Sequence, residues 1–182
     1  MTTYGGKDLA ASFRTVRKNT VIAATEIPED QYGFRAAPGT RTVAEQLVHI
    51  ASAQRIQERI QRVDRRATLE GFDFPALFSE VIAEEKKPRS KAEILSLLEE
   101  NGEEFAKWLD TLTDDFLAER VQMPAGMTPA NKSRLEMLLS VKEHEMHHRA
   151  QVMLMQRMIG MVPHGTRAFN ERMAQMQKPA AA

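Results

Sequence analysis

Three of the five histidines in the sequence have the spacing that a metal site built on helices would need. His144 and His148 are four residues apart, so on an α-helix they lie about 40° apart on one face. That face also carries Met137 and Val141, so we expect both imidazoles to point into the protein. His49 lies on the apolar stripe of another predicted helix. Buried imidazoles need partners, and a divalent metal ion would accept the lone pairs of all three.

Three neutral imidazoles would leave a fourth coordination position open to water or a substrate. This pattern is more typical of a catalytic ion than of a structural one. Zinc, nickel, iron and copper all suit three imidazoles, and the order of affinities does not choose among them. The alternative interpretation is that these histidines are ordinary core residues with hydrogen-bond partners.

We expect the other two histidines to have different roles. His147 lies three residues after His144 and could also chelate, but we favour His148 as the ligand. We expect His147 to line the pocket or to hydrogen-bond beside the ion. His164 follows a helix stop signal, Gly160 with Pro163, and is expected to be exposed.

Residues 144–148 also match the H-E-x-x-H signature of zinc proteases, in which the glutamate activates the metal-bound water. Glu145 is therefore a candidate general base, and His147 is the second candidate catalytic residue. The longer form of the signature requires a glycine and a third histidine, where this sequence has Gln151 and Leu154. The β-sheet expected before that motif is also missing, so we do not favour a protease.

A di-iron carboxylate bundle is a further alternative. It would need Glu-x-x-His on two helices and a glutamate on each of the other two. Glu145 and His148 supply one such pair, but Glu45 and His49 are one residue too far apart, and Glu45 is expected to cap a helix.

The elements that must position these residues are predicted to be helices, because apolar residues recur at intervals of three and four. A first helix has its apolar stripe from Leu9 to Ile27 and ends at Pro28. Thr42 to Glu45 forms a capping box, which begins a second helix that reaches about Val63. Residues 71–88 are less regular and predict a short packed helical segment.

The second half of the chain supplies two more helices. Ser90 to Glu93 is another capping box and begins a helix that runs to about Leu112. The fourth helix is predicted from Asn131 to Ile159. Four amphipathic helices predict an all-α four-helix bundle with a short extra helical segment between helices two and three. We expect one domain over residues 1–182, with a core at about 7–163 and a C-terminal tail at 164–182.

Composition excludes several classes of protein. The 25 acidic and 25 basic residues balance, so no global field attracts nucleic acid or an anionic membrane. The sequence has no cysteine, which removes disulfides and thiolate ligands and fits a reducing compartment. With no apolar leader and no stretch of about 20 apolar residues, we expect a cytoplasmic protein. The arginines along the second helix are interpreted as a solvated helix face: Arg55, Arg59, Arg62 and Arg66.

Residues 34–51, residues 144–151 and the closing Gly160–Pro163 resemble the DinB-like (damage-inducible) family of metal-binding bundles. The resemblance extends from about Ser12 to Pro163. In that family, one histidine early in the second helix and a His-x-x-x-His pair in the fourth hold the metal. The resemblance therefore implies a three-histidine site with zinc or nickel, and it implies that dimers are frequent. A second apolar stripe on the fourth helix also favours a homodimer: Leu135, Leu139, Met146 and Met153.

Some members of this family resemble thiol transferases that use bacillithiol or mycothiol, and others resemble isomerases. We predict a metal-dependent hydrolase or a low-molecular-weight thiol S-transferase that acts on a small molecule. A nucleophilic thiol would have to come from outside, since the chain has no cysteine. The alternative is a metal-binding or dimeric interaction protein without catalysis. Because metal binding requires neutral imidazoles, affinity is expected to fall as the pH drops through about 6.

Overall fold

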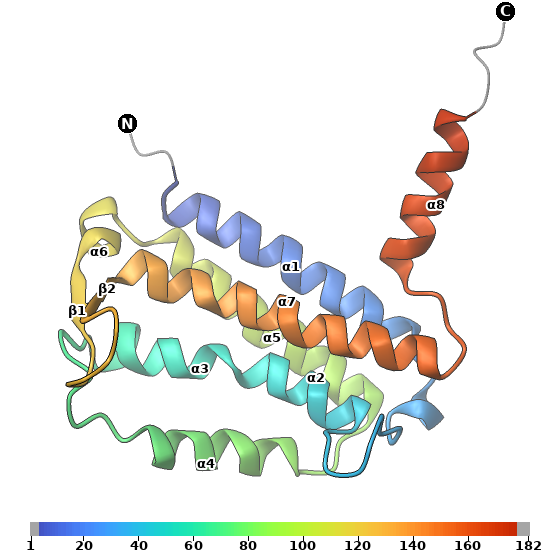
Figure 1. The fold of residues 1–182 in the computed structure, drawn as a ribbon, viewed down its shortest axis with the longest axis horizontal. Coiled ribbons are helices and arrows are strands. Elements are labelled where there is room, and N and C mark those ends of the chain that lie inside the picture. Colours follow the sequence, from blue (N-terminus) through green and yellow to red (C-terminus); the bar gives the residue numbers. More distant parts are fainter. Residues whose placement is uncertain (1–3, 178–182) are drawn as a thin grey trace, which may run out of the picture.

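The computed structural model describes residues 4–177, most of which are helical. Long helical stretches lie side by side and form a four-helix bundle, as predicted (Figure 1). The bundle consists of α1 (Gly6–Glu26), α2 (Val43–Ser52) continued by α3 (Gln54–Gln57) and a π-helical turn (Glu58–Val63), α5 (Lys91–Asp110) and α7 (Arg134–Met158). The other elements are a 3-10 turn (Glu29–Gln31), α4 (Phe74–Glu85), α6 (Asp114–Ala118), β1 (Arg120–Gln122), β2 (Asn131–Ser133) and α8 (His164–Met176).

The helices do not follow one another around the bundle. α1 packs against α5 and α7, and α2 packs against the same two helices, so α1 and α2 occupy opposite corners. α2 and α5 are neighbours that run in the same direction (Figure 1). The chain must therefore travel back along the bundle between them, and α4 makes this crossover while packing on α2. The sequence left open whether the bundle contains a crossover, and the structure shows that it does.

Local signals in the sequence account for most helix boundaries. Both capping boxes form, because Thr42 and Ser90 each accept a hydrogen bond from the backbone N–H three residues later. The fourth helix begins three residues later than predicted, at Arg134. Asn131–Ser133 instead forms β2, which pairs antiparallel with β1, and Ser133 caps the helix.

The second helix is interrupted where the sequence predicts one continuous helix. α2 ends at Ser52, and α3 begins at Gln54. Arg17 of α1 reaches this break: its Nη2 lies 3.4 Å from the carbonyl oxygen of Ile50 and 3.5 Å from Oε1 of Gln54. The buried guanidinium of Arg17 therefore lies against polar groups of α2 and α3 on both sides of the break.

The core lies between the four long helices, and the tail lies outside it. Phe13, Leu47, Leu98 and Leu109 are at most 1 % exposed. By contrast, α8 stands away from the bundle and has no buried residue (Figure 1). None of the described helices has the length and apolar character that crossing a bilayer requires.

Candidate metal centre

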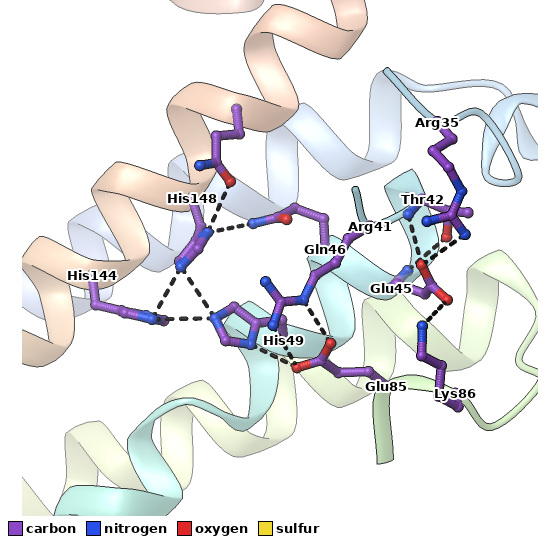
Figure 2. A network of polar contacts seen from close by, with 11 residues as sticks. Arg35, Arg41, Thr42, Glu45, Gln46, His49, Glu85, Lys86, His144 and His148 are labelled. Carbon is purple, nitrogen blue, oxygen red and sulfur yellow. Dashed lines mark hydrogen bonds and ion pairs between the residues drawn. The ribbon is translucent and has the colours of Figure 1, made fainter. Parts of the chain in front are cut away.

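The three predicted metal ligands meet in one cluster between α2 and α7 (Figure 2). The Nε2 atom of His49 lies 3.2 Å from Nε2 of His144 and 3.1 Å from Nε2 of His148. The Nε2 atoms of His144 and His148 are 3.1 Å apart. Three nitrogen atoms thus form a nearly equilateral triangle. Among the described residues, no other group of three or more histidines and carboxylates converges in this way.

Two neighbouring helices produce this geometry. His144 and His148 are one turn apart on α7, so their side chains project to the same side. α2 packs against α7 and brings His49 to meet them. The spacing in the sequence therefore predicts the pair on α7, whereas the third ligand depends on how the two helices pack.

The triangle has the dimensions that a metal ion requires. Zinc–imidazole bonds of about 2.0–2.1 Å place tetrahedral nitrogen ligands about 3.3–3.4 Å apart, and facial octahedral ligands about 2.8–3.0 Å apart. The observed separations of 3.1–3.2 Å lie between these values. The three imidazoles fit a divalent ion, and the distances do not select one metal.

The hydrogen bond on the far side of His49 fixes its tautomer. Nδ1 of His49 lies 2.8 Å from a carboxylate oxygen of Glu85, which can only accept when ionised. Nδ1 therefore carries a proton, and in the neutral imidazole the lone pair is on Nε2, facing the other two histidines. A carboxylate behind a histidine is a common way to orient a metal ligand and to raise its basicity.

Glu85 is held ionised by a second partner. Arg41 donates to both of its carboxylate oxygens, over 2.6 and 3.2 Å (Figure 2). Burial raises the pKa of Glu85, but the hydrogen bonds from His49 and Arg41 outweigh this effect and leave the pKa below its usual value. The chain Arg41–Glu85–His49 therefore keeps a negative charge behind the cluster.

His148 has amide partners at its Nδ1 atom. Oε1 of Gln151 lies 2.9 Å from this atom, and Nε2 of Gln46 lies 2.6 Å from it. If the side-chain amide of Gln46 were rotated by 180°, its Oε1 would replace Nε2 and give Nδ1 of His148 a second oxygen acceptor. Nδ1 of His144 is different, since it is buried and no described residue hydrogen-bonds to it.

Burial keeps two of the three imidazoles in the neutral form. Desolvation and the neighbouring histidines lower the pKa of His144 to about 4. Desolvation also lowers the pKa of His148 to about 4, although the hydrogen bond with Gln151 opposes it. Both rings are therefore neutral near pH 7, and the neutral form is the one that binds a metal.

The two predicted catalytic residues are not part of the triangle. Glu145 is 2 % exposed, and both of its carboxylate oxygens accept from Nε of Arg17, over 3.0 and 3.1 Å. A rotation of about 100° per residue turns Glu145 away from the face of His144 and toward α1. His147 is exposed and lies beside His148, with 4.8 Å between ring centroids. The prediction that His164 is exposed was wrong. This histidine is half-buried, because it packs near Asn19 of α1.

Four residues around the histidines were not singled out by the sequence. Gln46 and Gln151 lie three residues from His49 and His148 respectively, so helical spacing could have identified them. Arg41 lies in a loop, and Glu85 lies on the irregular crossover segment. Nothing local marks these two, because the return of α4 along α2 brings Glu85 to both His49 and Arg41.

Two cavities open on the cluster. One, of about 370 Å³, is lined by His49 and His144 together with mainly apolar residues of α3, α4 and α7. The other, of about 580 Å³, is lined by His148 and several polar residues, including Gln46 and Lys86. Arg41, Ile82 and Glu85 line both cavities. The cluster is therefore reachable by small molecules.

The family model of the DinB superfamily matches residues 12–152, which include all three histidines of the cluster. No curated protein matches the chain.

Solved structures with the same fold come from several bacteria. YfiT from Bacillus subtilis is described as a probable metal-dependent hydrolase with an unusual four-helix-bundle topology. It is 20 % identical, with a TM-score of 0.66 over 88 % of this chain and 91 % of its own. The DinB-like protein YjoA from Bacillus subtilis is 18 % identical, with a TM-score of 0.60 over 84 % of this chain and 92 % of its own. A protein from Streptococcus pneumoniae is 18 % identical, with a TM-score of 0.63 over 86 % of this chain and 93 % of its own. At these identities the similarity establishes the fold.

Proposed function

Because the chain belongs to the DinB superfamily and brings three histidine Nε2 atoms together, we propose that it is a metal-dependent enzyme that acts on a small molecule. The observation that carries this proposal is the triangle of Nε2 atoms at 3.1–3.2 Å. Glu85 fixes one lone pair toward the centre, and low pKa values keep the other two rings neutral. If all three rings carry their proton on Nδ1, three lone pairs face one another, and a cation between them would stabilise this arrangement.

The chemistry would combine the properties of the ion and of the chain. A divalent ion is a Lewis acid that lowers the pKa of a water molecule or thiol bound to it. The chain would hold this ion with His49, His144 and His148, and would orient His49 through Glu85 and Arg41. Zinc and nickel are the ions that we propose first.

Two reactions are consistent with this arrangement. The description of YfiT as a probable metal-dependent hydrolase supports water as the nucleophile. A low-molecular-weight thiol is the other candidate, and it would have to be external because the chain has no cysteine. Loss of p-nitrophenyl esters in the presence of the metal-loaded protein, without any added thiol, would indicate hydrolysis. Loss of 1-chloro-2,4-dinitrobenzene only when a thiol is added would indicate S-transfer.

Metal stoichiometry tests the site itself. Plasma mass spectrometry on protein purified without chelator is expected to find about one ion per chain, and each of His49→Ala, His144→Ala and His148→Ala should lose it. His147→Ala is the matched control, because this histidine is on the same helix but outside the triangle. Little metal in the wild type after reloading with zinc or nickel would refute the site.

A second candidate is a dimeric metal-binding protein without catalysis. Met146, in the apolar stripe of α7, is 45 % exposed, whereas Leu135 and Leu139 already pack against the core. We propose a homodimer that covers Met146, and light scattering should give about twice the 20.6 kDa of one chain. Met146→Glu should return the mass to that of a monomer. A metal-loaded dimer that turns over none of the esters or thiol–electrophile pairs would favour this function over the enzyme.

A further inference from the structure

The crossover helix α4 presents two large apolar side chains to the cavity of about 370 Å³ beside His49 and His144. Phe78 and Ile82 are one turn apart on α4 and are 45 % and 50 % exposed. Only Val81 and Glu85 of this helix are buried. Apolar surface that borders a cavity and remains open to solvent is surface that a ligand can cover favourably.

The rest of the cavity wall is apolar too. Ala53 and Ile56 contribute from the broken second helix, Val81 from α4, and Val141 from α7. Three elements therefore surround the space with aliphatic and aromatic groups. Small-molecule sites typically have this character, with a few polar groups that fix the orientation of the ligand.

The polar groups of the lining belong mainly to the histidine cluster. Gln57 and Ser140 are the exceptions, and both already make intramolecular hydrogen bonds: Gln57 accepts from Gln61, and Ser140 donates to the carbonyl oxygen of Met137. The polar contacts left for a ligand are therefore concentrated at His49, His144 and their immediate neighbours.

The charges of the lining cancel. Arg41 and Glu85 are the charged residues among those that line this cavity, and they form a two-bond ion pair with each other. Away from a metal ion at the histidines, a charged group of a ligand would lose its hydration without gaining a free counter-charge from the chain. The cavity beside His148 differs, because Lys86, Gln46 and Gln151 make its lining more polar.

We propose that the cavity bounded by Phe78 and Ile82 binds a small molecule with an uncharged, mainly apolar body and a single polar group that is directed at His49 and His144. This inference deepens the proposed function and rests on it. At roughly 30 Å³ for each water-sized group, about 370 Å³ holds on the order of a dozen non-hydrogen atoms. Phe78 and Ile82 are then the residues that select the substrate.

Titration calorimetry with 1-naphthol and 5-hydroxynaphthalene-1-sulfonate tests this proposal on zinc-loaded protein. The two probes share the aromatic body and the hydroxyl group, and the second carries a negative charge on the other ring. 1-Naphthol should bind with one site per chain and a negative heat-capacity change, and at least about tenfold more tightly than the sulfonate. Phe78→Ser and Ile82→Ser should each weaken 1-naphthol about five- to tenfold, since each removes apolar contact surface.

The matched control is Phe169→Ser. This phenylalanine is 61 % exposed on α8, so the same substitution removes a similar exposed ring away from the cavity. It should leave the affinity for 1-naphthol unchanged. Equal weakening by Phe169→Ser and Phe78→Ser would overturn the proposal, as would equal affinity for the two probes or wild-type affinity in both α4 variants.

Zinc content measured on the same samples separates this proposal from the proposed function. One zinc ion per chain without binding of 1-naphthol would refute the apolar substrate class and leave the metal site intact. Binding of 1-naphthol that depends on Phe78 in a protein that retains neither zinc nor nickel after loading would support the apolar cavity and refute the metal-dependent enzyme.

Discussion

α7 contributes to a buried ion pair and to a half-buried histidine cluster, which face different helices and differ in how completely they are hydrogen-bonded. Toward α1, Glu145 accepts from Arg17, which also donates to the carbonyl oxygen of Leu98 over 2.6 Å. Arg17 thereby links α1 with α5 and α7, and its Nη2 approaches Ile50 on α2. This cluster ties all four helices together, and its charges are paired.

Toward α2, the histidine cluster is incomplete. Three ring nitrogen atoms face one another at 3.1–3.2 Å, and Nδ1 of His144 has no hydrogen-bond partner among the described residues. Buried polar groups in proteins are almost always satisfied. The paired Arg17–Glu145 cluster is explained by folding alone, whereas three converging imidazole nitrogens fit a metal ion. We therefore expect the first cluster to serve stability, and we propose the second as a binding site.

The largest expected effect tests the first half of this comparison. Glu145→Ala would leave the guanidinium of Arg17 buried without its counter-charge, and breaking a buried pair in this way costs about 3–5 kcal/mol of unfolding free energy. Urea denaturation of the metal-free protein measures it. Glu143→Ala is the control, because Glu143 is an exposed glutamate on the same helix, and it should change the free energy by less than about 0.5 kcal/mol. Equal stability of the two variants would contradict the structural role of Glu145.

The second effect tests whether the histidine cluster is completed by a metal. Zinc at about a hundred times its dissociation constant should raise the unfolding free energy by about 2.7 kcal/mol, because it binds only the folded chain. His148→Ala should abolish this increase while leaving the metal-free protein folded. His147→Ala should retain it. Stabilisation by zinc that survives in His148→Ala would place the ion elsewhere.

The third effect concerns the carboxylate behind His49. Glu85→Gln keeps an oxygen acceptor but removes the negative charge, so we expect zinc affinity to fall about 10- to 100-fold. Glu84→Gln is a closely matched control, since Glu84 is the preceding residue and pairs with Lys87 and Arg89. Competition with a chromophoric chelator measures both affinities. Equal loss in the two variants would show that Glu85 acts through general electrostatics and not through its hydrogen bond to His49.

The two clusters also differ in how far their residues can be predicted from the sequence. Helix caps and the juxtaposition of His144 and His148 depend on residues within four positions of one another. Both capping boxes form, and the two Nε2 atoms lie 3.1 Å apart, while metal binding by this pair stays a prediction. His49 was found because an inward-facing histidine is unusual on an apolar stripe. Arg17 was missed, since an arginine within an apolar stripe gives no sign that its charge is buried and paired.

Glu145 and Glu85 both show that position in the sequence does not identify the groups that surround the candidate metal ligands. The sequence motif puts Glu145 next to a metal ligand, but helical rotation directs its carboxylate to Arg17. Glu85 has no motif and lies 36 residues from His49, yet it makes the bond that orients this histidine. Proximity along the chain is therefore a poor guide to the groups that surround a ligand, because α4 reaches the site only through the crossover.

The smallest effect is the pH dependence of the metal-free protein, and it follows from the incomplete cluster. The pKa values of His144 and His148 are about 4 in the folded chain, against about 6.5 when unfolded. Between these values the unfolded state binds more protons, so the unfolding free energy is fully present above pH 6.5 and falls as the pH drops toward 4. After allowance for solvent screening we expect a loss on the order of 1–2 kcal/mol. Urea denaturation at pH 7 and pH 4.5 measures this loss, and the His144→Ala, His148→Ala double variant should lack most of it. An unchanged slope in that variant would assign the pH dependence to carboxylates.

The same low pKa values also change the expected pH dependence of metal binding. Residue type alone predicts that these two ligands are protonated below about pH 6, whereas in the folded chain this happens at about pH 4. Zinc should therefore be retained at pH 5.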